Sequence, residues 1–79
     1  MKNKYEINIY FKDGSNSLNK VRDYQVRETR DLICIDIVSQ KDDRILIRNA
    51  IVLRKDSIET IEYFENGKRT EAKQGIDKL

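Results

Sequence analysis

The chain of 79 residues contains no histidine, no proline and a single cysteine, Cys34. Histidine is the side chain most often used for proton transfer near neutral pH, and no serine or cysteine here has a recognisable base partner. A lone cysteine excludes an internal disulfide, and there is no cysteine cluster to hold zinc. The glycines form no phosphate-binding pattern. The sequence therefore predicts a protein that is not an enzyme and that has no metal or cofactor.

Long apolar runs are also missing. No purely apolar run exceeds four residues; Leu32–Ile35 has four and Ile45–Ile47 has three, and such runs are too short to span a membrane. The amino-terminal residues lead directly into a strand pattern and lack the apolar stretch of a signal peptide. We therefore expect no membrane association and a cytoplasmic location.

An excess of one charge is absent as well. The chain has 16 basic and 14 acidic residues, for a net charge of +2. A nucleic-acid-binding protein usually carries a denser basic stripe, and a DNA mimic is strongly acidic. The acidic residues Asp13, Asp42 and Asp43 lie in expected turns, where aspartate is common for reasons of turn chemistry rather than metal binding. The charge pattern favours protein partners.

What the chain does contain is a period of two. Tyr5, Ile7, Ile9 and Phe11 alternate with polar or outward-facing residues, which is typical of a strand with one buried face. Asp13-Gly14 then supplies a tight turn. The apolar residues include eleven Ile and four Val but only two Ala, and β-branched side chains favour strands over helices.

The same pattern recurs, and predicts an all-β fold: a small five-stranded antiparallel meander or an SH3-like barrel with one short helical turn. We expect one domain over residues 1–64 and a polar carboxy-terminal hairpin or tail over 65–79, loose beyond about Glu71. Residues 18–22 form an extended segment that brings Leu18 or Val21 to the core. The expected strands cover residues 5–12, 24–28, 32–38, 44–53 and 60–64.

Residues 57–66 have two interpretations. Asp56 and Glu59 fit the start of a helix, and Asn66-Gly67 fits its end. We prefer a strand that follows a helical turn at residues 55–58, because Ile, Thr, Tyr and Phe are poor helix formers at this density.

Residues 32–38 and 44–50 are expected to pair around a polar loop at 39–43. One register places Ile37 opposite Ile45 and Ile35 opposite Ile47, and together with Ile33 these residues would fill the core. The other face of the hairpin then carries four apolar residues, where a sheet in water normally shows polar ones. This face needs a cover: the tail, the first strand, a second copy or a foreign protein. The candidate contact residues are Leu32, Cys34, Val38 and Leu46.

A second candidate surface is basic. Arg44 and Arg48 alternate with Leu46 on one strand, and Arg54 and Lys55 follow. With exposed tyrosines nearby, these residues would track phosphates and stack bases. The alternative is that they are solvated surface charges interleaved with aspartates.

The segments Ile7–Gly14 and Ile58–Phe64 carry a resemblance. Both resemble the short β-meander proteins of phages and prophages of low-GC Gram-positive bacteria, and the helical turn before the last strand is similar to SH3-like and Sm-like barrels. The uridine-binding residues of Sm proteins have no match here. The resemblance implies a phage or mobile-element protein in the bacterial host cytosol that binds a protein partner and inhibits a host or defence protein. A homodimer is expected where a second copy covers the apolar face of the hairpin. The alternatives are a nucleic-acid-binding regulatory barrel and a minor virion or assembly component.

Overall fold

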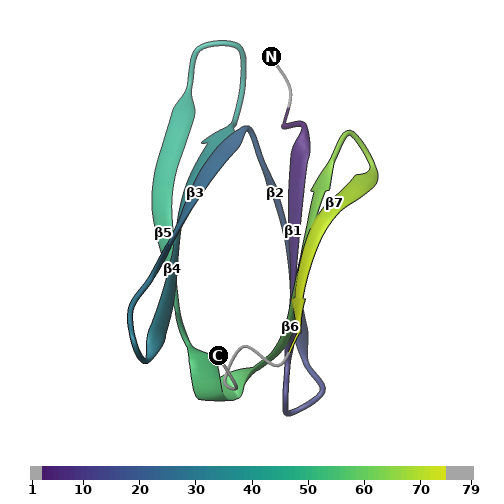
Figure 1. Ribbon diagram of the computed structural model, residues 1–79. Coiled ribbons are helices and arrows are strands. Elements are labelled where there is room, and N and C mark those ends of the chain that lie inside the picture. The colour runs from purple at the N-terminus through teal and green to yellow at the C-terminus, as the bar shows by residue number, and fades with distance from the viewer. Residues whose placement is uncertain (1–2, 75–79) are drawn as a thin grey trace.

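The computed structural model describes residues 3–74, and the side chains of residues 3–70. The predicted all-β class is confirmed, and so is the short helical turn, which is a 3-10 turn (η1) at Lys55–Ser57. There are seven strands rather than five (Figure 1). They are β1 (Tyr5–Phe11), β2 (Asn16–Val21), β3 (Asp23–Glu28), β4 (Leu32–Gln40), β5 (Leu46–Arg54), β6 (Ile58–Glu65) and β7 (Lys68–Gln74).

The strands form two antiparallel sheets rather than a closed barrel. The larger sheet has the order β2-β1-β6-β7 and the smaller one has the order β3-β4-β5. Figure 1 shows the two sheets facing each other, joined at one end where β2 runs into β3 and at the other where β5 leads through η1 into β6. The expectation of a barrel is therefore wrong, because the strands at the two edges of each sheet do not pair across to the other sheet.

The two additional strands have separate origins. The segment around residues 18–22 is strand β2, which is separated from β3 by Arg22 alone. At its end Val21 is fully buried, whereas Leu18 is 55% exposed. Of the two residues expected to reach the core, only Val21 does so.

The second additional strand follows the turn at Asn66-Gly67. Both residues have positive φ, 52° and 83°, as a two-residue hairpin turn requires. The preferred strand at residues 60–64 is confirmed as part of β6, which pairs with β7. The expected loose tail does not begin at Glu71, because β7 continues to Gln74. Residues 75–79 lie outside the described part of the chain.

A single apolar layer fills the space between the sheets. It takes alternate residues from β1 and β4, because successive side chains of a strand point to opposite faces. In β6 the alternation is interrupted between Ile58 and Ile61, where the register against β1 shifts. Tyr24 of the smaller sheet stacks on Tyr63 of the larger one, with ring centroids 5.4 Å apart, and meets Tyr5 edge-on at 5.3 Å. The core residues are Ile7, Ile9, Val21, Ile33, Ile35, Ile37, Ile58, Ile61 and Tyr63.

The register of the β4–β5 hairpin differs from the expected one by four residues. Ile35 lies opposite Ile51 and Ile37 opposite Asn49, so Ile47 meets Ser39 instead. A shift by an even number keeps every side chain on its predicted face. The shift does, however, carry Ile45 and Ile47 beyond the end of the core, where they are 46% and 45% exposed. Their assignment to the core is wrong.

Candidate protein-contact surface

The outer face of the smaller sheet carries the predicted contact residues. The register of β4 and β5 places these residues on the side away from the core. Leu46 is 41% exposed, and the other three are half-buried. A fifth apolar residue, Val52, lies opposite Cys34 and is 59% exposed. We call this set the apolar outer face: Leu32, Cys34, Val38, Leu46 and Val52.

Val52 was missed by the sequence reasoning because of the register error. In the expected pairing it would have lain beyond the end of the partner strand, with no place on the shared face. The sequence does contain a signal for it. Residues two apart in a strand share a face, so Val52 lies on the same face of β5 as Leu46, which is one of the expected contact residues. The most exposed apolar side chain of the described surface is thus a member of the face, although the expected residues did not include it.

Polar residues divide the apolar outer face into two parts. Arg27 of β3 donates to both carboxylate oxygens of Asp36, at 2.8 and 3.3 Å, and this carboxylate raises the pKa of the Arg27 guanidinium. Asp36 lies between Cys34 and Val38 along β4. A shallow hollow of about 330 Å³ adjoins Val38. Its lining residues are Asp23, Tyr24, Gln25, Asp36, Val38 and Arg48.

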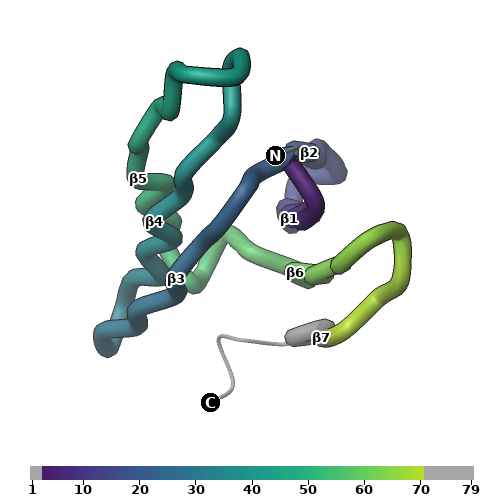
Figure 2. The backbone as a smooth tube through the Cα atoms, turned by 90° about the horizontal axis from the view of Figure 1, so that it is seen from above, coloured from purple at the N-terminus to yellow at the C-terminus, as the bar shows by residue number. Residues whose placement is uncertain are grey.

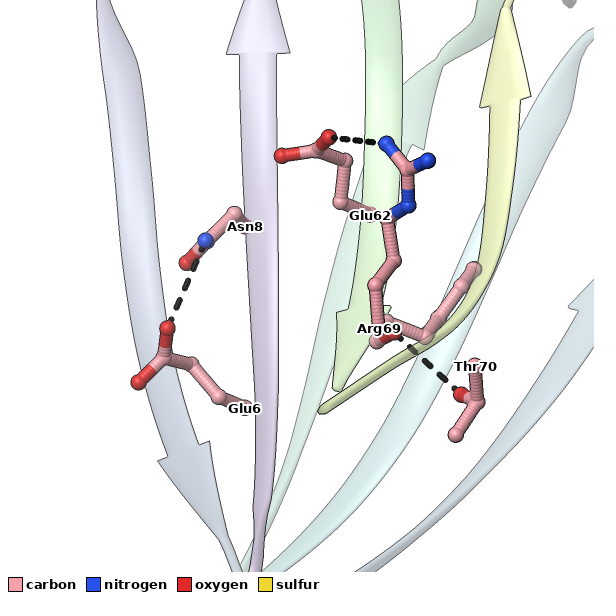
Figure 3. A network of polar contacts seen from close by, with 6 residues as sticks. Glu6, Asn8, Glu62, Arg69 and Thr70 are labelled. Carbon is pink, nitrogen blue, oxygen red and sulfur yellow. Dashed lines mark hydrogen bonds and ion pairs between the residues drawn. The ribbon is translucent and has the colours of Figure 1, made fainter. Parts of the chain in front are cut away.

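The outer face of the larger sheet differs in kind. Asn8 donates to Glu6 at 3.4 Å, and Arg69 donates to Glu62 at 3.3 Å (Figure 3). The pKa of the Tyr10 hydroxyl is raised, mainly by its hydrogen bond to Glu62 and to a lesser extent by partial burial. Polar contacts among side chains are usual for a sheet face in water. The face also exposes Leu18 and Tyr10, each of which lies opposite a polar residue, Asn8 and Asn16 respectively.

The far end of the β4–β5 hairpin extends past the crossing from β2 to β3 (Figures 1 and 2). Gln40 fixes the base of this extension through three hydrogen bonds. Its backbone N–H donates to the Asn3 side chain at 2.8 Å, its carbonyl accepts from the same side chain at 3.4 Å, and its amide oxygen accepts from Arg22 at 2.9 Å. Beyond this anchor the hairpin exposes Ile45, Leu46 and Ile47.

The basic candidates do not gather on one surface. Arg44 lies in the loop before β5, which begins at Leu46. Arg54 pairs with Asp56 at 2.9 Å. Lys55 pairs with Glu28 at 3.8 Å, with only 17% of its side chain exposed.

Arg48 is the one member of the basic set that borders the hollow on the outer face. It shares that face with Arg54 but stands six positions away, about 20 Å along the strand. A surface that tracks phosphates needs a continuous row of cations. Two of the four side chains already serve acidic partners, so the basic set does not form such a row.

No group of three or more His, Cys, Asp or Glu side chains in residues 3–70 gathers to hold a metal ion. Among the described residues, no helix has the length and apolar character to cross a membrane. Comparison of the chain with protein-family models, curated proteins and solved structures finds no match.

Proposed function

We propose that this protein is a non-enzymatic binding module that acts by protein–protein contact through the apolar outer face of its smaller sheet. The observation that carries the proposal is the difference between the two outer faces. The larger sheet exposes Leu18 and Tyr10 opposite polar residues and beside polar contacts, whereas the smaller sheet gathers five apolar residues on its outer face, of which Val52 and Leu46 are exposed. Burial of such apolar area against a partner is the main source of association free energy between proteins.

The polar groups on this face fit a protein partner as well. The Arg27–Asp36 ion pair and Arg48 stand beside Val38 and Gln25 around the hollow. Interfaces commonly combine an apolar centre with arginine and a polar rim, and hot-spot side chains insert into such hollows. Mixed charge on the face favours a protein over a polyanion, because cations alone would suit the latter.

The biological role that we propose is that of a phage or mobile-element factor which binds and inhibits a bacterial host or defence protein. This part rests on the resemblance of Ile7–Gly14 and Ile58–Phe64 to small phage β-meander proteins. An inhibitor of this kind needs no catalytic residue, and it acts by covering a surface of its target.

The test is affinity capture from a Gram-positive lysate with two matched variants. Val38→Lys places a charge beside the hollow on the apolar outer face, and Leu18→Lys places the same charge on the outer face of the larger sheet. The expected result is that the wild type and Leu18→Lys retain the same protein, while Val38→Lys loses it. Far-UV circular dichroism and thermal melting confirm that both variants fold.

The proposal is contradicted if Val38→Lys and Leu18→Lys retain the partner equally. Recovery of nucleic acid instead of protein, abolished by Arg48→Ala with Arg54→Ala, would favour the regulatory nucleic-acid-binding alternative.

A further inference from the structure

Exposed apolar side chains concentrate on one strand. Among the described residues, six large apolar side chains are exposed, and four of them lie on or next to β5: Ile45, Leu46, Ile47 and Val52. β5 is also the last strand of the smaller sheet. An open edge that carries apolar side chains is a template for pairing with another strand.

The backbone of β5 is available for such pairing. Lys41 N–H donates to the Ile45 carbonyl at 3.0 Å, and hydrogen-bonded pairs alternate along an antiparallel ladder. The even-numbered residues of β5 therefore direct their N–H and C=O groups away from β4, toward the open edge. One of these groups has a local partner, because the Ala50 N–H donates to the Asn49 side chain at 2.9 Å.

The edge has few of the features that prevent association. Proteins protect open edges with proline, bulges, inward-pointing charges or charged side chains along the strand, and of these β5 has only the last, at Arg48 and Arg54. β5 contains no proline, and its pairing with β4 runs without a register shift over nine residues. The inward-facing residues of β5 are Ile47, Asn49, Ile51 and Leu53, none of which is charged.

We propose that β5 pairs antiparallel with β5 of a second copy of this chain, about a two-fold axis at Asn49. The two three-stranded sheets then form one continuous six-stranded sheet. The partner is chosen by the pattern of β5 itself, which is nearly symmetric about Asn49. In this register Leu46 faces Val52 of the second copy, Ile47 faces Ile51, and Ile45 faces Leu53.

The neighbouring register is less favourable. An axis at Ala50 would place Leu46 opposite Arg54 and Val52 opposite Arg48, so that each exposed apolar side chain would meet a cation. With the axis at Asn49, Arg48 meets the small side chain of Ala50 instead. This register therefore pairs all four exposed apolar residues with apolar ones.

Charge at the ends of the paired strands is balanced. Arg54 would face Arg44 of the second copy, and two like charges in this position repel. Arg54 already pairs with Asp56 at 2.9 Å, and the Arg44 backbone N–H donates to Asp42 at 2.9 Å. Each arginine thus brings an acidic neighbour to the same end of the interface.

The pairing does not depend on the proposed partner protein. It joins two apolar outer faces edge to edge, with Leu46 of one copy beside Val52 of the other, and so would enlarge the contact surface. Val38 lies on β4, away from the axis. The Val38→Lys variant should therefore remain dimeric even where it loses a partner, which separates failure of one proposal from failure of the other.

The first test is sedimentation equilibrium of the purified full chain. The wild type is expected to form a dimer, and Leu46→Glu or Val52→Lys alone should raise the dissociation constant about tenfold or more. An equimolar mixture of the two variants should recover association, because the new carboxylate and the new ammonium lie opposite each other in the heterodimer. Both positions are exposed, so circular dichroism should show both variants folded.

Three outcomes would overturn the proposal. They are a wild type that stays monomeric over the whole concentration range, a dimer that neither substitution weakens, and variants whose mixture fails to recover association. A dimer strengthened by Leu46→Glu would instead place the axis at Ala50, where the carboxylate faces Arg54, and would overturn the Asn49 register.

The second test is a cross-link that reads the register directly. On the axis the two Asn49 residues form a non-hydrogen-bonded pair with Cα atoms about 4.5 Å apart, which a disulfide can bridge. Asn49→Cys in a Cys34→Ser background should cross-link rapidly on mild oxidation. Val52→Cys in the same background is the matched control, because its own copy lies about 20 Å away along the strand. Equal cross-linking of the two variants would contradict the proposed register.

Discussion

The backbone N–H of Arg22 donates to the carbonyl of Val38 at 2.7 Å, at the residue where the chain leaves one sheet and enters the other. This bond extends the pairing of β4 beyond Asp23, the first residue of β3. It fixes the smaller sheet to the end of β2, next to the buried side chain of Val21. The spacing of the two sheets at this end therefore depends on this backbone donor, together with the bonds of Gln40 to Asn3 and Arg22.

A proline at this position tests that dependence. Arg22→Pro removes the N–H and leaves the Val38 carbonyl without its donor, so we expect a loss of about 1–3 kcal/mol in the free energy of unfolding. Arg22→Ala is the control, since it keeps the N–H and loses only the side-chain bond to Gln40. It should cost about 1 kcal/mol or less. Urea unfolding measures both, and equal losses would show that the side chain, not the backbone bond, holds the crossing.

The core assignment predicts a sharp contrast between two β-branched residues. Ile35 is fully buried on the inner face of β4, and Val52 is exposed on the outer face of β5. Ile35→Ala is expected to cost roughly 2–5 kcal/mol, which is enough to unfold a domain of this size. Val52→Ala should cost about 1 kcal/mol or less. Thermal melting of the two variants checks this, and similar losses would mean that the faces of the sheet have been exchanged.

The sequence predicted the faces of the strands well because a period of two is a local property. The buried isoleucines of β1 and β4 follow directly from their spacing of two, although Asn8, between two of them in β1, is buried as well. The preference for a strand at residues 60–64 is confirmed as well, since β-branched and aromatic residues outweigh a helix cap at Asp56. The residues of the apolar outer face belong to the same alternation, so all four expected members share one side of the sheet.

The number of strands and the register were not local properties, and both were missed. The turn between β4 and β5 is stabilised by Asp42, whose side chain accepts from the N–H groups of Arg44 and Ile45 at 2.9 and 3.1 Å. No alternation rule fixes where such a turn begins, so the pairing could slide by two or four residues without moving any side chain to the other face. Likewise, nothing in the residues around Arg22 marked the point at which one long extended segment divides between two sheets.

The first turn gives a prediction about acid stability. Asp13 accepts from the hydroxyl and the backbone N–H of Ser15, at 2.6 and 2.8 Å. These two bonds hold the pKa of this carboxyl below its ordinary value, and the bond from the hydroxyl has the larger effect. A lowered pKa in the folded state adds stability above the unfolded pKa, and this contribution is lost as the pH falls through the folded value.

Removal of the Ser15 hydroxyl should therefore flatten part of the acid dependence. We expect Ser15→Ala to reduce the free energy of unfolding slightly at neutral pH and to have a smaller effect well below about pH 4, where the carboxyl is protonated in both states. Urea unfolding at the two pH values measures the difference. Asp13→Asn removes the titrating group, so its stability should lack this component at any pH. A loss from Ser15→Ala that is the same at both pH values would contradict the assignment.

The last prediction separates three roles for Leu46. If it belongs to a contact surface, Leu46→Glu should change the free energy of unfolding of the dilute monomer by about 0.5 kcal/mol or less, because the side chain is 41% exposed and the isoleucines of the opposite face are untouched. The same variant should lose association or partner binding. If Leu46 were core, the buried and unpaired carboxylate would collapse the fold.

A nucleic-acid-binding protein would give a third result: Leu46→Glu would have little effect, while Arg44→Ala with Arg48→Ala would weaken binding and flatten its dependence on salt. Melting and binding assays on Leu46→Glu and on the double arginine variant therefore give a different combination of results for each role. A surface role changes binding without stability, a core role changes stability, and a phosphate-binding role makes binding depend on the arginines.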